Sequence, residues 1–370
     1  MIYLDSAANT IVEEEVLDEF VKTTKKYIAN PNSSHELGRL AKEEIDKTSN
    51  MISKYFNMKS DGVIYTSGSS ESNNLVIKGI CEQRKELGNK IIISAVEHSS
   101  VVAPCNYLAD HGYDVSVIPL TSNGTIDLDV LEKELDDKTI LVSICSVDSE
   151  LGTVQPISDI AKLVKRYPNC VFHTDATQAI GKVKMDFDGV DFITFAPHKF
   201  FGLNGFGVLL NINNIKLTPL IHGGKSTTIY RSGTPVTANV IALGVAFKIA
   251  TSKLDERYKY ISKLNKKLRD TFKDIKCIHI NSPENSIPNT LNISLIDKDT
   301  KSVLKKLEEN EIYLSTTTAC ALGSSPSKSV LAITNDINLA SNTIRISLSH
   351  LNSMDDIDNF IKIFKDIMGV

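Results

Sequence analysis

The fold is indicated most clearly by two neighbouring stretches, V-F-H-T-D-A-T-Q-A at residues 171–179 and D-F-I-T-F-A-P-H-K-F-F-G at residues 191–202. Each contains an apolar strand pattern, and the two strands lead to Asp175 and to His198-Lys199. Open α/β sheets bind ligands at the carboxyl ends of their buried parallel strands. We therefore expect Asp175 and Lys199 to face one cleft, with a buried Asp–Lys ion pair as the alternative.

Apolar runs of this kind alternate with amphipathic stretches over the first two thirds of the chain. Continuous apolar strands separated by helices are typical of a mostly parallel sheet that is covered on both faces. The predicted strands are 63–66, 91–95, 115–119, 140–146, 171–174, 192–195 and 207–210, and the predicted helices include 37–56, 73–87, 128–135 and 157–166.

The tail changes character after residue 255. It predicts a long charged helix at 253–273, strands at 277–280, 289–296 and 343–348, a helix at 300–309, and a final helix in which Ile357, Phe360, Ile361 and Phe364 have helical spacing. We expect two domains. The large one would span residues 15–255, and a smaller α+β one would combine residues 1–14 and 256–370.

Composition excludes several classes of function. Of the 370 residues, 42% are hydrophobic and 23% charged, and 41 basic against 45 acidic side chains give a net charge of -4, which does not fit a nucleic-acid-binding surface. No apolar stretch approaches the ~20 residues that a membrane span requires, and the N-terminus lacks a signal-peptide pattern. The six cysteines show no C-x-x-C spacing, so we expect no disulfide framework, no metal site and a cytoplasmic location.

The stretch T-S-G-S-S-E-S-N-N at 66–74 lies between a predicted strand and a predicted helix. Gly68 would allow a tight turn, while Ser69 and Ser70 would offer hydroxyl and N–H groups at a helix N-terminus, where the helix dipole favours an anion. The stretch is therefore a candidate phosphate cradle. An ordinary helix cap, with Ser70 and Asn73 as the capping residues, is the alternative.

A lysine beside a phosphate cradle, with an aspartate on a neighbouring strand, is also the arrangement that binds pyridoxal phosphate. The carboxylate would favour the protonated ring nitrogen and make the ring an electron sink. A lysine desolvated near other cations becomes nucleophilic. His98, at the end of another predicted strand, could stack on the ring or could be an ordinary hydrogen-bonded histidine at a turn.

Cys320 lies in S-T-T-T-A-C-A-L-G-S-S-P-S at 315–327, a run of small and turn-forming residues. Most free cysteines are inert buried side chains. This composition instead favours an exposed loop in which a thiolate can form. We expect a functional role for Cys320 and structural roles for the other five cysteines.

A series of segments in one order extends over nearly the whole chain. They are I-Y-L-D (2–5), N-P-N-S-S-H-E-L-G (30–38), T-S-G-S-S-E-S-N-N (66–74), E-H (97–98), H-T-D-A-T-Q (173–178), H-K (198–199), H-G-G and R-S-G-T (222–234), P-N-T-L-N-I-S (288–294), A-C (319–320) and I-R-I-S-L (344–348). Together they resemble the NifS/IscS-type cysteine desulfurases, in the class V aminotransferase family. The resemblance implies an α/β fold of pyridoxal-phosphate-dependent transferase fold type I, with a mostly parallel seven-stranded sheet in the large domain and a smaller α+β C-terminal domain.

The resemblance also implies roles for residues at matched positions. The cofactor-binding residues would be Lys199 as the covalent anchor, Asp175 at the ring nitrogen, Gln178 and Ser149 at the phenolic oxygen, His98 stacked on the ring, and Ser69, Ser70, His198 and Thr234 of the partner subunit at the phosphate.

Asn30 and Arg345 would bind the substrate carboxylate, a task to which the guanidinium fork is suited. With Lys199 and His98 as further catalytic residues, Cys320 would take sulfur from L-cysteine, leaving L-alanine and an enzyme persulfide. The resemblance implies a homodimer that passes sulfur to an acceptor protein, either an iron–sulfur scaffold or a tRNA-thiolation protein, with no direct nucleic-acid or membrane partner.

Five departures from the family pattern leave alternatives open. Ser149 replaces an Asn, Ala196 replaces a phosphate-binding Ser, K-S-T-T-I-Y follows Gly224, A-L-G-S-S follows Cys320 in place of a T-S-rich stretch, and His350 replaces an Arg. Each lost hydrogen bond would cost about 1 kcal/mol. The alternatives are another enzyme of this fold, such as a selenocysteine lyase, a cysteine-sulfinate-type lyase or an aminotransferase, or a degenerate paralogue that acts as a binding subunit.

Overall fold

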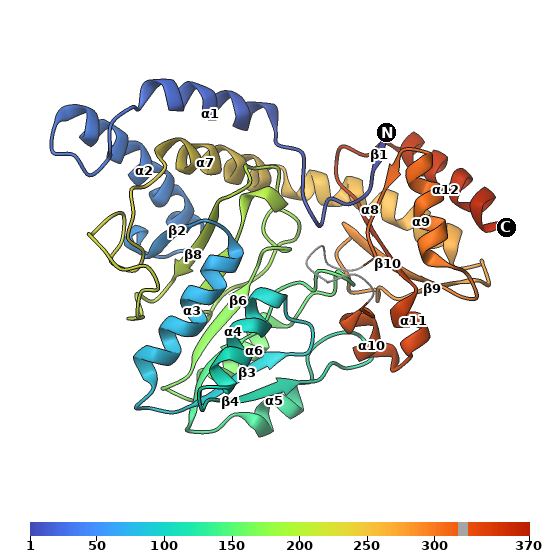
Figure 1. Cartoon of the computed structure of the whole chain (residues 1–370), viewed down its shortest axis with the longest axis horizontal. Helices are drawn as coiled ribbons and strands as arrows, with labels where there is room; N and C mark the ends of the chain where they lie inside the picture. Colours follow the sequence, from blue (N-terminus) through green and yellow to red (C-terminus); the bar gives the residue numbers. More distant parts are fainter. Residues whose placement is uncertain (317–324) are drawn as a thin grey trace.

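The computed structural model of the chain describes residues 1–316 and 325–370 (Figure 1). Its largest element is a seven-stranded sheet with the order β2-β8-β7-β6-β5-β3-β4. Strand β8 runs antiparallel to its neighbours β2 and β7, and the other adjacent strands are parallel, which confirms the predicted mostly parallel sheet. The strands are β2 (Val63–Thr66), β3 (Lys90–Ser94), β4 (Asp114–Ile118), β5 (Thr139–Ser143), β6 (Val171–Asp175), β7 (Phe192–Phe195) and β8 (Gly207–Asn211).

Both faces of this sheet are covered, because successive strand side chains point to opposite sides. In β2, Val63 and Tyr65 belong to one apolar cluster, and Ile64 belongs to another on the opposite face. The first cluster also holds side chains from α1 (Glu14–Lys26), α2 (Glu36–Tyr55), α5 (Leu128–Glu134), α6 (Ile157–Val164) and α7 (Thr237–Ser252). The second cluster holds side chains from α3 (Ser69–Arg84) and α4 (Ser99–Ala109).

The C-terminal part builds its own core around a smaller antiparallel sheet of order β12-β10-β9 and a short parallel pair, β1-β11. Its strands are β1 (Ile2–Tyr3), β9 (Ile278–Ile280), β10 (Thr290–Leu295), β11 (Ile312–Tyr313) and β12 (Thr343–Ser347). Its helices are α8 (Leu254–Phe272), α9 (Thr300–Glu309), α10 (Lys328–Thr334), α11 (Ile337–Ser341) and α12 (Met354–Met368). The helical spacing predicted for α12 is confirmed, because Ile357, Phe360, Ile361 and Phe364 are all buried.

The N-terminus lies with the C-terminal part of the chain, and Figure 1 shows the blue strand β1 among the orange and red elements. Leu4 belongs to the C-terminal apolar cluster, whereas Val16 belongs to the core of the large sheet. These separate cores support the proposed division into residues 15–255 and residues 1–14 with 256–370. Residues 5–10, which we call the N-terminal segment, connect the two parts.

The described residues also form the short 3-10 turns η1 (Ser60–Gly62) and η2 (Pro197–Lys199). Across the described residues, every helix is too short or too polar to cross a membrane.

Candidate active site

A pocket at the carboxyl ends of the large sheet's strands collects most of the predicted site residues. It encloses about 1110 Å³ of empty space, counting its open mouth. The predicted residues that line it are Ser69, Ser70, His98, Ser149, Asp175, Gln178, His198, Lys199 and Arg345. Asp175 and Lys199 therefore face one cleft, as the strand-end pattern predicts.

Helix α3 presents an uncapped N-terminus to this pocket. The residue at its cap position is Gly68, and among residues 1–316 and 325–370 no side chain accepts a hydrogen bond from the first turn. The capping interpretation of Ser70 and Asn73 is therefore wrong. Ser69 is held at the pocket wall, where its Oγ lies 2.8 Å from Thr177 Oγ1. Free backbone N–H groups at the positive end of a helix are suited to binding a phosphate.

The Asp175 carboxylate is held by two hydrogen bonds. Asn73 Nδ2 donates to its Oδ2 over 2.7 Å, and the Thr177 backbone N–H donates to its Oδ1 over 3.0 Å. The side chain is only 7% exposed, so these donors offset much of the cost of burying its charge. Within the part of the chain that the structure describes, no ion pair joins Asp175 to Lys199. The alternative prediction of a buried Asp175–Lys199 ion pair is therefore wrong.

Asn73 also links Asp175 to His98 through Ser100. Its Nδ2 donates to Ser100 Oγ over 2.9 Å, and Ser100 Oγ lies 2.8 Å from His98 Nδ1. Because the Ser100 backbone N–H donates to the same Nδ1 over 3.1 Å, this nitrogen is an acceptor and the ring hydrogen belongs on Nε2. Burial lowers the pKa of His98, which favours the neutral ring. The two interpretations of His98 are compatible, since its ring both caps α4 and lines the pocket.

The opposite wall of the pocket is formed by the N-terminal segment. Lys199 Nζ donates to the carbonyls of Ala7 and Ala8, over 2.9 and 2.5 Å. Thr10 holds the neighbouring residue, because its N–H and its hydroxyl both donate to the His198 carbonyl over 3.0 Å. The lysine is thus oriented by backbone carbonyls that are far from it in sequence.

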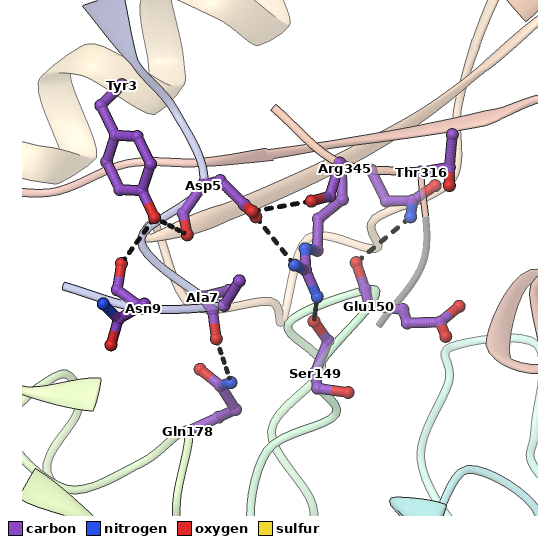
Figure 2. Close-up of polar contacts among 12 residues, drawn as sticks. Tyr3, Asp5, Ala7, Asn9, Ser149, Glu150, Gln178, Thr316 and Arg345 are labelled. Atoms are coloured by element: carbon purple, nitrogen blue, oxygen red, sulfur yellow. Dashed lines mark hydrogen bonds and ion pairs between the residues drawn. The ribbon is translucent and has the colours of Figure 1, made fainter. Parts of the chain in front are cut away.

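The N-terminal segment is itself braced from both ends. The Tyr3 hydroxyl lies within hydrogen-bond distance of the Asp5 and Asn9 carbonyls, at 3.1 and 2.9 Å. Gln178 Nε2 donates to the Ala7 carbonyl over 3.0 Å, from the strand-end side of the pocket (Figure 2). These contacts close the segment into a tight turn against the pocket.

Arg345, on β12, is almost fully buried at 1% exposure. Its Nη2 donates to Asp5 Oδ1 over 2.9 Å and its Nη1 donates to the Ser149 carbonyl over 3.1 Å, as Figure 2 shows. Asp5 Oδ2 also accepts a hydrogen bond from Ser315 Oγ over 2.7 Å. Among the described residues the Arg345 Nε finds no acceptor, so the guanidinium retains hydrogen-bonding capacity. Ser149 makes this contact through its backbone carbonyl, so the contact does not depend on its side chain, and its contact with the cofactor stays a prediction.

Two predicted residues, Asn30 and Thr234, do not line the pocket of their own chain, and a third lies outside the described part of the structure. Asn30 is exposed on the loop between α1 and α2, where its Oδ1 accepts a hydrogen bond from the Asn32 backbone over 2.9 Å. Thr234 is exposed before α7, away from the pocket lining of its own chain. Cys320 lies outside the described residues.

Several residues that shape the site were not assigned a role from the sequence. Ser100 and Thr177 lie beside predicted residues, so their position in the E-H and D-A-T-Q motifs was the available signal. Lys182, which donates to Gln178 Oε1, follows that motif by four residues. The carbonyls of Ala7 and Ala8 gave no signal, because every residue carries one.

Comparison with known proteins shows which family the chain resembles over nearly its whole length. A family model described as aminotransferase class-V matches residues 2–360. A relative from Dictyoglomus turgidum named cysteine desulfurase IscS is 35% identical over 99% of this chain and 94% of its own length. A solved NifS-like protein superposes with a TM-score of 0.93 at 32% identity, covering 100% of this chain and 99% of its own. A structure described as SspA in complex with cysteine gives a TM-score of 0.83 at 30% identity, over 94% and 99% of the two chains.

Proposed function

The chain belongs to the aminotransferase class-V family, and from this premise we propose that it is a pyridoxal 5'-phosphate-dependent cysteine desulfurase. The observation that carries the proposal is the pocket in which Lys199, Asp175 and Arg345 meet at the uncapped start of α3. In the reaction, the sulfur of L-cysteine is transferred to the Cys320 thiol. The products are L-alanine and a persulfide on Cys320, which balance the two reactants.

The donor set of the pocket fits pyridoxal phosphate. An amine, a fixed carboxylate and a helix N-terminus are the three groups that this cofactor requires. His198 lines the pocket, and its Nδ1 is buried without a hydrogen-bond partner among the described residues. Burial, with Lys199 and Lys182 nearby, lowers the pKa of His198 to about 4, so its ring is neutral and can donate or accept a hydrogen bond.

Each residue then has a defined task in holding the cofactor. Lys199 would anchor it covalently and Asp175 would pair with the ring nitrogen, while Gln178 would donate to the phenolic oxygen. The serines at the start of α3, with His198, would hold the phosphate. Bound in this way, the cofactor supplies an electron sink next to the amino group of the substrate.

The remaining residues act on the substrate and on protons. Arg345 presents a buried guanidinium, which suits a carboxylate. His98 carries its hydrogen on Nε2 and is oriented through Ser100, so it can hold or pass a proton at that atom. The predicted contact of Asn30 with the substrate carboxylate stays a prediction, because in one chain this residue lies outside the pocket.

A second copy of the chain would complete the phosphate site with Thr234. This residue is exposed, and it lies in a stretch that also exposes large apolar side chains. These side chains are Leu220, Ile221, Ile229 and Val236, with exposures of 40%, 41%, 62% and 54%. Apolar side chains exposed in one stretch support a homodimer that buries them. The sulfur acceptor, an iron–sulfur scaffold or a tRNA-thiolation protein, and the cytoplasmic location stay predictions.

The reaction is tested by supplying L-cysteine to the purified protein loaded with pyridoxal phosphate. We expect alanine and sulfide in the presence of a thiol reductant, and their loss in Cys320→Ala. Cys277→Ala is the matched control, because Cys277 lies by the C-terminal core and not in the pocket. A wild-type protein that holds the cofactor but makes no alanine contradicts the proposal. Activity that survives Cys320→Ala, or a keto-acid product, points to another enzyme of this fold.

The shared site is tested by mixing two inactive variants. Lys199→Ala removes the covalent anchor, and Thr234→Glu places a negative charge where the phosphate of the partner would bind. A dimer of one copy of each contains one intact site, so co-expression should restore about a quarter of wild-type activity. If co-expressed chains form dimers but stay inactive, Thr234 acts within its own chain.

A further inference from the structure

Lys182 is a buried lysine beside the pocket, and the proposed function gives it no task. It follows β6 in a short turn and is 9% exposed. Its Nζ donates a hydrogen bond to Gln178 Oε1. Within the described residues no carboxylate forms an ion pair with it. A buried cation without a counter-charge lowers the stability of a fold, so its presence calls for another explanation.

The contact with Lys182 determines which way the Gln178 amide points. A charged lysine ammonium has only donors, and the Ala7 carbonyl can only accept, so the Gln178 atom that faces Lys182 is the amide oxygen. The Nε2 of Gln178 then lies on the other side and donates one hydrogen to the Ala7 carbonyl over 3.0 Å. If the amide were flipped, the Gln178 NH2 group would face the Lys182 ammonium, which is also a donor. The Gln178 oxygen would then face the Ala7 carbonyl oxygen, which is also an acceptor. The second Nε2 hydrogen is left for the pocket, which Gln178 lines.

The surroundings of Lys182 are strongly cationic. Burial, together with Lys199 and Arg345, lowers the pKa of Lys182 to about 7. Arg257 and His350 line the same small cavity as Lys182 and Lys199. The carboxylates nearest to these groups are already engaged, Glu13 with Arg257 and Asp5 with Arg345. Below pH 7, where Lys182 keeps its proton, it therefore adds positive charge near the amine of Lys199.

We propose that Lys182 is a positioning residue, which fixes the Gln178 amide so that one of its N–H groups points into the pocket toward the phenolic oxygen of the cofactor. This inference rests on the proposed function, because it assumes pyridoxal phosphate in that pocket. Lys182 also sets the charge that Lys199 experiences, and these two effects can be separated by substitution.

The test uses the protein loaded with pyridoxal phosphate, and compares Lys182→Met with Lys182→Gln. Met removes both the donor and the charge, whereas Gln keeps a donor for the Gln178 oxygen but carries no charge. Lys184→Met is the matched control, since Lys184 is an exposed lysine two residues away that pairs with Asp255. Two quantities are measured: the dissociation constant of the cofactor, and the pH midpoint of the visible absorption band.

We expect Lys182→Met to weaken cofactor binding roughly three- to tenfold, the effect of one lost hydrogen bond. Lys182→Gln should stay within about twofold of the wild type, because the amide orientation is kept. In both variants the pH midpoint of the band should rise by about half a unit to one unit, because a cation that opposes protonation at Lys199 is gone. Lys184→Met should change neither quantity.

The possible failures are distinguishable. A wild type that shows no visible band with pyridoxal phosphate contradicts the proposed function. A wild type with the band, together with a Lys182→Met variant whose cofactor dissociation constant and band midpoint both equal those of Lys184→Met, overturns the inference for Lys182 alone. A purely structural role would lower the stability of the variants without moving the midpoint. If Lys182→Met does not fold, the midpoint of Lys182→Gln decides.

Discussion

The two walls of the pocket are built in different ways. The strand-end wall, formed by Ser69, His98, Asp175 and Lys199, places reactive side chains at the ends of strands and at the start of a helix. The N-terminal segment opposite it contributes mainly backbone carbonyls, from Ala7 and Ala8, together with the Asp5 carboxylate.

This difference determines how each wall can be recognised in the sequence and which substitutions can disrupt it. The strand-end wall depends on residue type, so a single substitution removes its chemistry. The carbonyls of the N-terminal segment are supplied by any residue, and what matters is where the segment lies. It can therefore be probed only through side chains such as Asp5, which belongs to it, and Gln178, which binds the Ala7 carbonyl and accepts a hydrogen bond from Lys182.

The largest expected effect comes from the strand-end wall. Asp175→Ala should lower kcat/KM for alanine formation on the order of 10²–10³-fold, the typical loss when one preorganised electrostatic group is removed. The substitution also leaves the donors of Asn73 and Thr177 without their acceptor. Asp188→Ala, on an aspartate that is 87% exposed, is the control and should be neutral. A loss below about fivefold would mean that Asp175 only orients Asn73.

A smaller effect is expected from the N-terminal segment. Asp5→Asn keeps an oxygen for Arg345 but removes the charge that balances its guanidinium. Since part of the pair is solvent-accessible, we expect KM for L-cysteine to rise roughly three- to tenfold, with kcat within about twofold of the wild type. Steady-state alanine formation measures both constants, with Asp366→Asn on the exposed side of α12 as the control. A fall in KM would show that Asp5 competes with the substrate for Arg345 instead of orienting it.

The last expected effect concerns stability and not activity, and it is a pH dependence that comes from Lys182. Its pKa falls from 10.5 to about 7 on folding, so between these values the unfolded chain binds a proton that the folded chain has lost. The free energy of unfolding of the wild type should therefore rise with pH relative to that of Lys182→Gln, by at most about 1.4 kcal/mol per pH unit. The free energy of unfolding of Lys182→Gln exceeds that of the wild type by most below pH 7, and this difference declines toward pH 10.5.

Urea unfolding of both proteins near pH 7 and near pH 9 checks this prediction. All other titrating groups are shared, so they cancel in the difference between the two curves. A difference that stays constant over this range would mean that Lys182 keeps its proton in the folded protein.

Much of the fold could be read from the sequence, because it rests on local patterns. The apolar runs and the helical periodicity predicted all seven strands of the large sheet and placed α12 correctly. The strand-end rule brought Asp175 and Lys199 to one cleft. The predicted cap of α3 was wrong, because the helix begins at Ser69, so Ser70 and Asn73 lie inside it, and the Asn73 amide donates to Asp175.

The sequence by itself determined the set of reactive groups and the edge of the sheet where they gather. Both follow from residue type and from the pattern of apolar residues along a local stretch of chain. Only the tertiary structure determined how the side chains of those groups are oriented. Ala7, Ala8 and Asp5 come from the first turn of the chain, whereas the residues they orient lie between 178 and 345. A carbonyl oxygen is chemically the same in every residue, so its contribution depends on where the folded backbone carries it.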